Sequence, residues 1–210
     1  MTGDVGTMVA SGAAAHVPPA VPEDALRAEM YSLLATLLRA APSPELLDTL
    51  TRLDGDDSEM GTAANALARL AQTQDEGRIR REYHDLFVGI GRGELVPFGS
   101  YYLTGFLNEK PLGELRGHMR MLGIERAEGV KQPEDHIAAL MEMMSGLILG
   151  SFAGAADGNA QAEFFRRHVD SWARHFFQDL EGARSAVFYA PVGTMGRVLM
   201  EVEAQAFAMA

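Results

Sequence analysis

The chain has 210 residues, of which 47% are hydrophobic, and its formal net charge is -11. That length and apolar content suffice for one sizeable core. The acidic surface repels nucleic acid phosphates and anionic membranes, so we expect no nucleic acid partner. The acidity either attracts a basic partner or only aids solubility. Because the chain has no cysteine, disulfides, thiolate metal sites and a cysteine nucleophile are excluded.

The N-terminal segment has the composition of a tail. Residues 1–22 are rich in Gly, Ala and Pro and cannot bury enough apolar surface to offset the entropy of ordering. We therefore expect a mobile tail over 1–22 and an all-helical domain over 23–210. The segment lacks the regions of a secretory signal, and no apolar run reaches the roughly 18 residues that cross a bilayer. These features predict a cytoplasmic protein without membrane insertion.

Apolar residues recur at helical spacing along most of the chain. Helices are predicted from Pro22 to Pro42, over 44–53, 62–73 and 75–87, over 111–122 with Gly123 as the stop, and from Pro133 onward. After a linker over 151–161, one helix carries Phe165 to Leu180 and another carries Val192 to Ala206. No stretch has the alternating pattern of a strand. The predicted fold class is all-α, a single globular domain of seven to nine helices.

Residues 88–102, VGIGRGELVPFGSYY, form the longest irregular stretch inside this helical pattern. Alternate glycines and Pro97 disfavour a helix there. Long loops in compact domains are often functional. Gly89 to Gly93 could suggest a phosphate-binding loop, but a helix precedes it and no Lys-Ser/Thr pair follows. We expect no nucleotide and no other cofactor.

The segment QPEDH introduces an apolar helix. Pro133 suits the first helical position, and Glu134 and Asp135 complement the positive end of the helix dipole. The same dipole disfavours a charged imidazole, so helix capping leaves His136 unexplained and a site could explain it. The methionines that follow either fill a core or line an adaptable peptide groove: Met141, Met143 and Met144.

The adjacent His84 and Asp85 raise a metal-dependent alternative. Such a pair occurs in metal phosphohydrolases, which need further His and Asp ligands on neighbouring helices. The six histidines of this chain are widely spread, without the spacing of a ligand set. We therefore expect no metal site and no catalytic residues. The alternative is a metal- or nucleotide-dependent hydrolase that uses His84, Asp85 and His136.

Two segments, EYHDLFVGIGRGELVPFGSYY and QPEDHIAALMEMM, resemble the signature segments of the TorD-like family, and the C-terminal helices are similar too. The resemblance covers roughly residues 23–203. It implies an all-helical cytoplasmic chaperone, without catalysis, that matures molybdenum-containing redox enzymes. Such a chaperone binds the twin-arginine signal peptide and the apo form of its partner and holds back export until the cofactor is inserted.

Carried over residue by residue, the resemblance implies a peptide-binding site with an apolar floor and an acidic rim. Aromatic side chains would supply large contacts of low entropic cost. Asp135 would take an arginine of the peptide in charge-assisted hydrogen bonds, and His136 would orient Asp135 or form a hydrogen bond with a peptide carbonyl. The predicted peptide-binding residues are Tyr83, Leu86, Phe87, Pro97, Phe98, Gly99, Ser100, Tyr102, Pro133, Asp135 and His136.

The sequence also departs from the pattern of the family. Ile90 and Val96 stand where the family commonly has loop prolines, and Ile137 replaces a usual leucine. The two loop changes bear on the shape of the loop and so on the identity of the client. The client enzyme is not named by the sequence, and no heptad seam fixes an oligomeric state. A third hypothesis is a helical scaffold whose motifs only pack and which binds no peptide.

Overall fold

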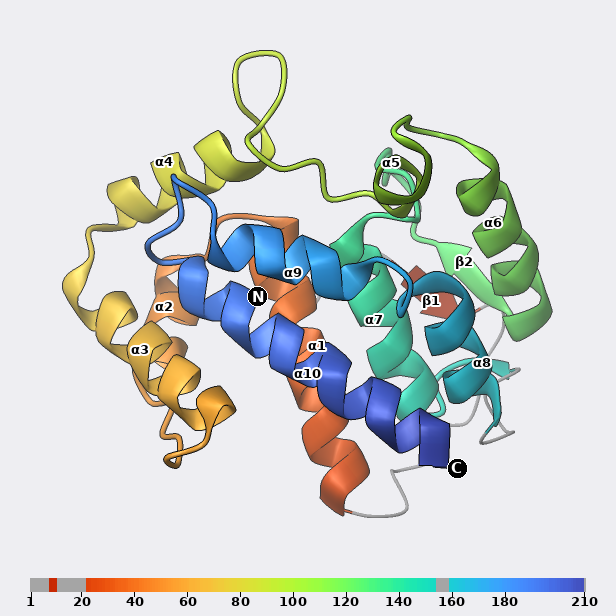
Figure 1. Cartoon of the computed structure of the whole chain (residues 1–210), viewed down its shortest axis with the longest axis horizontal. Coiled ribbons are helices and arrows are strands. Elements are labelled where there is room, and N and C mark those ends of the chain that lie inside the picture. Colours follow the sequence, from red (N-terminus) through yellow and green to blue (C-terminus); the bar gives the residue numbers. More distant parts are fainter. Residues whose placement is uncertain (1–7, 11–21, 154–158, 210) are drawn as a thin grey trace. The chain divides into compact units, whose positions relative to one another are not determined.

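The computed structural model describes residues 8–10, 22–153 and 159–209, and it is helical almost throughout (Figure 1). The described helices are α1 (Pro22–Arg39), α2 (Pro44–Leu50), α3 (Glu59–Thr73), α4 (Glu76–Phe87), α5 (Gly99–Thr104), α6 (Lys110–Leu122), α7 (Ile137–Ile148), α8 (Asn159–His168), α9 (Ala173–Glu181) and α10 (Ala190–Met209). The all-α prediction is confirmed. The ten helices of the described ranges exceed the predicted seven to nine.

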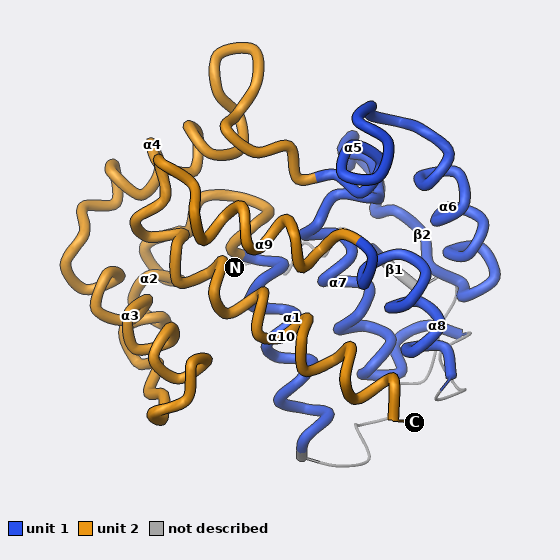
Figure 2. The backbone as a smooth tube through the Cα atoms, in the orientation of Figure 1, with its two compact units in different colours: residues 1–36, 98–171 blue, residues 37–97, 172–210 orange. Residues whose placement is uncertain are grey.

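The chain divides into two compact units (Figure 2). Unit 1 comprises residues 1–36 and 98–171, and unit 2 comprises residues 37–97 and 172–210. Each unit therefore combines two segments that are far apart in the sequence. Helix α1 contributes its first residues to unit 1 and its last turn to unit 2.

Helix α7 is the central core element of unit 1. It is buried on nearly every side. Its apolar stripe lies in the core and consists of Ile137, Leu140, Met141, Met144, Leu147 and Ile148. Met143 is also fully buried, so the three methionines fill core in this structure. The hydroxyl of Ser145 donates to the carbonyl oxygen of Ala28 on α1 at 3.0 Å, which ties the two helices together.

In unit 2, α10 packs closely against α9 and α3. Glycine permits this approach at two places. A Cβ on Gly193 would lie 2.5 Å from the backbone nitrogen of Glu181, and one on Gly196 would lie within the ring of Phe177. Arg197 of α10 then forms ion pairs with three acids, one each from α3, α9 and α10: Glu59, Glu181 and Glu201. Close packing and charge pairing thus act on the same face of α10.

Local capping sets several helix ends. Side chains of Ser43, Ser58 and Asp75 accept backbone hydrogen bonds at the starts of α2, α3 and α4. Gly123, with φ of 69°, ends α6, which confirms the predicted stop. Helix α3 begins at Glu59, three residues before the predicted start, because Ser58 caps it.

The structure also differs from other predictions of secondary structure. The helix expected from Phe165 to Leu180 is broken into α8 and α9, and the boundary between the units falls at residues 171 and 172. The irregular stretch expected over 88–102 ends where α5 begins at Gly99. Strands β1 (Met8–Ala10) and β2 (Ile124–Arg126) form a small antiparallel sheet. Strands of three residues are too short to give a readable alternation.

The predicted mobile tail, residues 1–22, lies mostly outside the described residues. Within it, Met8–Ala10 forms β1, which pairs with β2 in the register Met8 to Arg126. The side chain of Met8 is buried.

Candidate functional site

The predicted site residues fall into two groups that belong to different units. Unit 2 contains Tyr83, Leu86, Phe87 and Pro97. Unit 1 contains Phe98, Gly99, Ser100, Tyr102, Pro133, Asp135 and His136. Within unit 2, Tyr83 and Phe87 pack together, and within unit 1 Asp135 and His136 contact the segment 98–100.

The group on α4 forms a packed aromatic cluster. The ring of Tyr83 lies 5.0 Å from that of Phe87, and both contact the buried Tyr189, at 5.9 and 5.5 Å between ring centroids. The hydroxyl of Tyr83 donates to the carbonyl oxygen of Arg39 at 2.8 Å, at the end of α1. Burial raises the pKa of Tyr83. Leu86 is fully buried. These side chains therefore join α4 to other elements of unit 2.

Glu82 precedes that cluster and was missed by the sequence analysis. Its carboxylate is 9% exposed, and Oε1 accepts hydrogen bonds from the backbone nitrogens of Val187 and Tyr189, both at 2.8 Å. The acid thus holds the segment that leads into α10. Nothing within a few residues of Glu82 in the sequence indicates this pairing.

The irregular loop after α4 is anchored at both ends. The backbone nitrogens of Glu94 and Leu95 donate to carbonyl oxygens of Asp85 and Leu86, and the Glu94 carboxylate accepts from the backbone of Arg184 and Ser185. Figure 1 shows this loop protruding after α4. Ile90, which replaces the family proline, is fully exposed in it. Pro97, at its end, is buried.

The segment PEDH precedes helix α7 instead of forming its first turn, and this position explains the presence of His136. Helix α7 begins at Ile137, not at Pro133, and His136 is its N-cap. The imidazole Nδ1 of His136 accepts a hydrogen bond from the backbone nitrogen of Ala138 at 3.1 Å. A neutral imidazole can accept this bond, whereas a protonated one cannot. Helix capping therefore accounts for His136, and Pro133, Glu134 and Asp135 form the turn that precedes the helix.

Asp135 connects that turn to α5. Its Oδ2 accepts from the backbone nitrogen of Ser100 at 2.7 Å, and its carbonyl oxygen accepts from Gly99 at 2.9 Å. The side chain is 3% exposed, so a peptide arginine does not reach it in this conformation. Phe98 packs edge-on against His136 with 5.0 Å between ring centroids. Asp135 and His136 thus fix the start of α5.

Two polar atoms at this junction are buried without a hydrogen-bond partner among the described residues, namely Asp135 Oδ1 and Ser100 Oγ. Buried polar groups are usually paired, so such atoms often mark a functional place. Tyr102, farther along α5, is half-buried and packs against Tyr101.

Glu134 is the other acid that the sequence analysis placed at the helix dipole, and the structure gives it a different role. Its carboxylate, 8% exposed, pairs with Arg116 of α6 at 2.8 Å and with Arg126 of β2 at 3.8 Å. The ion pairs attach the turn before α7 to two other elements of unit 1.

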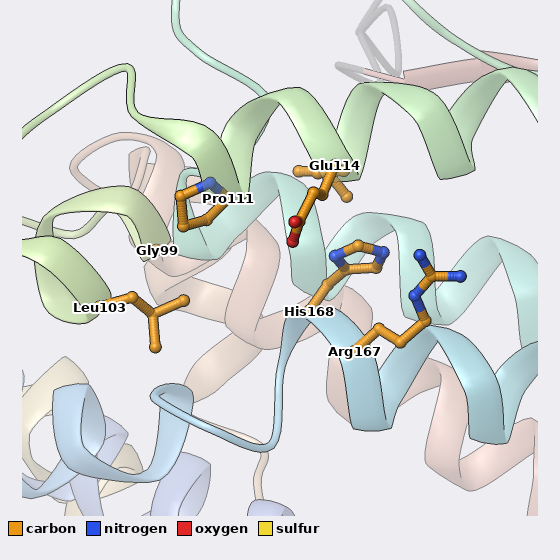
Figure 3. Close-up of a pocket in the computed structure, with 7 residues that line it drawn as sticks. Gly99, Leu103, Pro111, Glu114, Arg167 and His168 are labelled. Atoms are coloured by element: carbon orange, nitrogen blue, oxygen red, sulfur yellow. The ribbon is translucent and has the colours of Figure 1, made fainter.

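A small open cavity lies beside α5 in unit 1 (Figure 3). Its volume is about 70 Å³, and its lining residues are Gly99, Leu103, Pro111, Glu114, Leu115, Arg167 and His168. In Figure 3 the carboxylate of Glu114 and the ring of His168 point toward each other. The cavity therefore has an apolar wall and a polar end. The sequence analysis missed it because its lining comes from three helices.

Behind the polar end, His168 forms a hydrogen bond with His118, with 2.9 Å between His168 Nε2 and His118 Nδ1. Both histidines are buried. Burial, followed by the nearby His118 and Arg167, lowers the pKa of His168 to about 4. Burial and Arg167 also lower the pKa of His118. Both rings are therefore neutral near pH 7, and one of them donates to the other.

The residues of the hydrolase hypothesis do not form a metal site. His84 and Asp85 are exposed side chains 3.5 Å apart in unit 2, and His136 belongs to unit 1. Across the described ranges, no group of three or more His, Cys, Asp or Glu residues could hold a metal ion.

No helix in the described part of the chain combines the length and apolarity needed to cross a membrane.

Comparisons with known proteins agree with the sequence pattern. The family model described as nitrate reductase delta subunit matches residues 53–178. The chaperone protein TorD of Vibrio vulnificus (strain CMCP6) is 26% identical over 158 residues, which cover 68% of this chain and 74% of that protein. TorD of Vibrio atlanticus is 24% identical over 201 residues, which cover 85% and 93%.

A solved structure from Archaeoglobus fulgidus, described as a redox enzyme maturation protein, has the same fold. It matches with a TM-score of 0.58 at 18% identity, over 84% of this chain and 94% of that one.

The family match spans more than half of the chain and includes both signature segments. The curated relatives are named as chaperones, and the family is not a catalytic one, which confirms the prediction that the protein is not an enzyme. The hydrolase alternative finds no support. The chain therefore belongs to the nitrate reductase delta subunit family, the TorD-like family of redox enzyme maturation chaperones that its two signature segments resemble.

Proposed function

We propose that this protein is a cytoplasmic chaperone that binds the twin-arginine signal peptide and the apo form of a molybdenum-containing oxidoreductase. By holding the peptide, it delays export until the cofactor has been inserted. Family membership supports the general role in redox enzyme maturation. The chemistry of one exposed surface supports the specific ligand.

That surface, which we call the α5–α6 surface, consists of Leu103, Phe106 and Leu107. These large apolar side chains are 44%, 69% and 47% exposed within five residues of chain. Clustered apolar exposure of this kind marks interaction sites. This surface is the observation that carries the proposal, because a signal peptide offers an apolar stretch that would cover it.

The turn that presents this surface is ordered. Gly105, with φ of 81°, ends α5, and the hydroxyl of Thr104 accepts a hydrogen bond from the backbone nitrogen of Phe106 at 3.2 Å. The same hydroxyl donates to the carbonyl oxygen of Ser100 at 2.7 Å. A surface fixed before binding loses less conformational entropy when a ligand binds.

Acidic groups lie close in sequence to the apolar ones. Glu109 and Glu114, at the start of α6, are both exposed. The net charge of -11 adds a long-range attraction for a basic peptide. A peptide with an arginine pair beside an apolar stretch matches both features.

Asp135 and His136 take part in this function by holding α5. Asp135 caps the start of α5, and Phe98 packs on His136, so the motif sets where Leu103 and Phe106 are presented. We propose that the loop and motif residues of unit 1, from Phe98 to Tyr102 and from Pro133 to His136, form and support the peptide site. Within unit 2, we propose that Tyr83, Leu86, Phe87 and Pro97 support α4 and the loop that follows it.

The test is calorimetric binding of a synthetic peptide that carries an arginine pair followed by an apolar stretch. The double variant Phe106→Ser/Leu107→Ser should weaken binding by at least about tenfold, since each apolar contact is worth more than 1 kcal/mol when buried. Met121→Ser is the matched control, because Met121 is a 68% exposed apolar residue of the same unit outside this surface. Equal affinity for all three proteins, or no binding by the wild type, would refute the proposal.

A further inference from the structure

The cavity beside α5 has the size of one side chain. Its volume of about 70 Å³ corresponds to roughly five water-sized probes at about 10–15 Å³ each. A nucleotide or a pterin cofactor is far larger than this space. A single long side chain from a bound peptide would fill it.

The lining of the cavity selects the chemistry of that side chain. Leu103, Pro111 and Leu115 form an apolar wall, and Glu114 and His168 form the polar end (Figure 3). An arginine has three methylene groups followed by a planar donor group, so its stem fits the wall and its head fits the end. Arg167 also lines the cavity, but its guanidinium pairs with Glu163 at 2.9 Å and lies on the other side of the His168 ring from Glu114 (Figure 3).

Neighbouring side chains hold the polar end of the cavity in place. His168 is held by its hydrogen bond to His118, and its ring packs 5.1 Å from that of Phe164. Because His168 is neutral at pH 7, with a pKa of about 4, it does not repel a guanidinium. Glu114 pairs with Lys110 at the surface at 3.3 Å, and exposed pairs of this kind contribute little energy.

The position of the cavity links it to the apolar surface. Leu103 lines the cavity and also belongs to the α5–α6 surface. A peptide lying on that surface would therefore have an adjacent pocket for one of its basic residues. Asp135 supports the same wall, because it binds the backbone nitrogens of Gly99 and Ser100.

We propose that this cavity receives one arginine side chain of the bound signal peptide, with the guanidinium placed between Glu114 and His168. The inference rests on the proposed function, and it adds a specific subsite to it. It predicts that the protein distinguishes arginine from other residues through Glu114 and the cavity, rather than through net charge alone.

The experiment measures fluorescence anisotropy with three labelled peptides that share one apolar stretch and carry Arg-Arg, Lys-Lys or Gln-Gln. Glu114→Gln should weaken binding of the Arg-Arg peptide by about tenfold, the value of one charge-assisted hydrogen-bonded pair. The Gln-Gln peptide should be unaffected. Glu109→Gln is the control, because it removes the same charge from an exposed residue near the start of the same helix but outside the cavity.

Two further variants sharpen the result. Leu103→Trp fills the cavity from a partly exposed position and should also weaken binding of the Arg-Arg peptide. Arg167→Gln should leave that affinity unchanged or raise it. A weaker Arg-Arg complex with Arg167→Gln would indicate an anion in the cavity and would overturn the inference.

The outcomes separate the two proposals. If the wild type binds the Arg-Arg peptide but Glu114→Gln and Glu109→Gln behave alike, the subsite is wrong and the chaperone function stands. If the wild type does not bind the Arg-Arg peptide, both proposals fail.

Discussion

Each unit contains a buried carboxylate that accepts hydrogen bonds from the backbone of a remote segment. In unit 2, Glu82 binds two backbone nitrogens with one oxygen. In unit 1, Asp135 binds Ser100 with one oxygen, while the other is buried without a partner among the described residues. The segment held by Glu82 contains the fully buried Phe188 and Tyr189. The helix held by Asp135 leads to exposed apolar side chains.

Hydrogen bonds of the same type therefore stabilise a buried segment in unit 2 and fix the helix before an exposed segment in unit 1. Glu82 holds a segment of the interior of unit 2, whereas Asp135 holds the helix that leads to the exposed Leu103, Phe106 and Leu107. Only Asp135 belongs to a conspicuous motif. The environment of each acid, rather than the motif around it in the sequence, separates the two roles.

The largest effect on stability should come from Glu82→Ala. This change leaves one buried and one partly buried backbone donor without an acceptor, so the free energy of unfolding should fall by about 3 kcal/mol. Glu82→Gln retains an acceptor oxygen and should cost clearly less. Urea unfolding of the three proteins measures both values. A loss below about 1 kcal/mol for Glu82→Ala would mean that the hydrogen bonds to Val187 and Tyr189 matter little.

Asp135→Ala should cost about 2 kcal/mol, because α5 loses its cap and a buried donor loses its acceptor. It should also weaken peptide binding by disturbing α5. Asp135→Asn separates two roles, since the amide oxygen can still accept from Ser100 while the charge is gone. If Asp135 acts by position, the asparagine variant keeps most of the binding measured by calorimetry. Equal losses for both variants would instead assign the charge a direct contact with the peptide.

The buried histidine pair should make unit 1 sensitive to acid. The folded chain resists protonation of His168 down to a pKa of about 4, compared with 6.5 for an ordinary imidazole. Between these values the unfolded chain binds more protons, so stability falls as the pH is lowered from about 6.5 to about 4. Urea midpoints across this range should decline less for His168→Gln than for the wild type. Parallel curves would contradict this account.

The smallest effect should come from the exposed pair His84 and Asp85. Their side chains are 51% and 64% exposed, so His84→Ala and Asp85→Ala should each change the free energy of unfolding by less than about 0.5 kcal/mol. Peptide affinity should also stay unchanged. Loss of peptide binding with either variant, without loss of stability, would bring this surface of α4 into the site.

Many helices could be predicted from the sequence because helix formation depends on residues that are close together in the chain. Apolar residues at helical spacing identified α7 and its buried stripe, and Gly123 marked the end of α6. The signature segments identified the family. These features involve residues within a few turns of each other, where periodicity and backbone preference act directly.

The tertiary structure decided the roles of the site residues, because their partners lie far away in the sequence. Asp135 meets Ser100 across 35 residues, and Glu82 meets Tyr189 across 107. His136 was unexplained in the sequence because the true start of α7, at Ile137, depends on Pro133 to Asp135 being held in a turn by contacts outside the helix. The cavity needs three helices to exist at all. A local pattern carries no information about such pairings, since they form only when distant segments pack together.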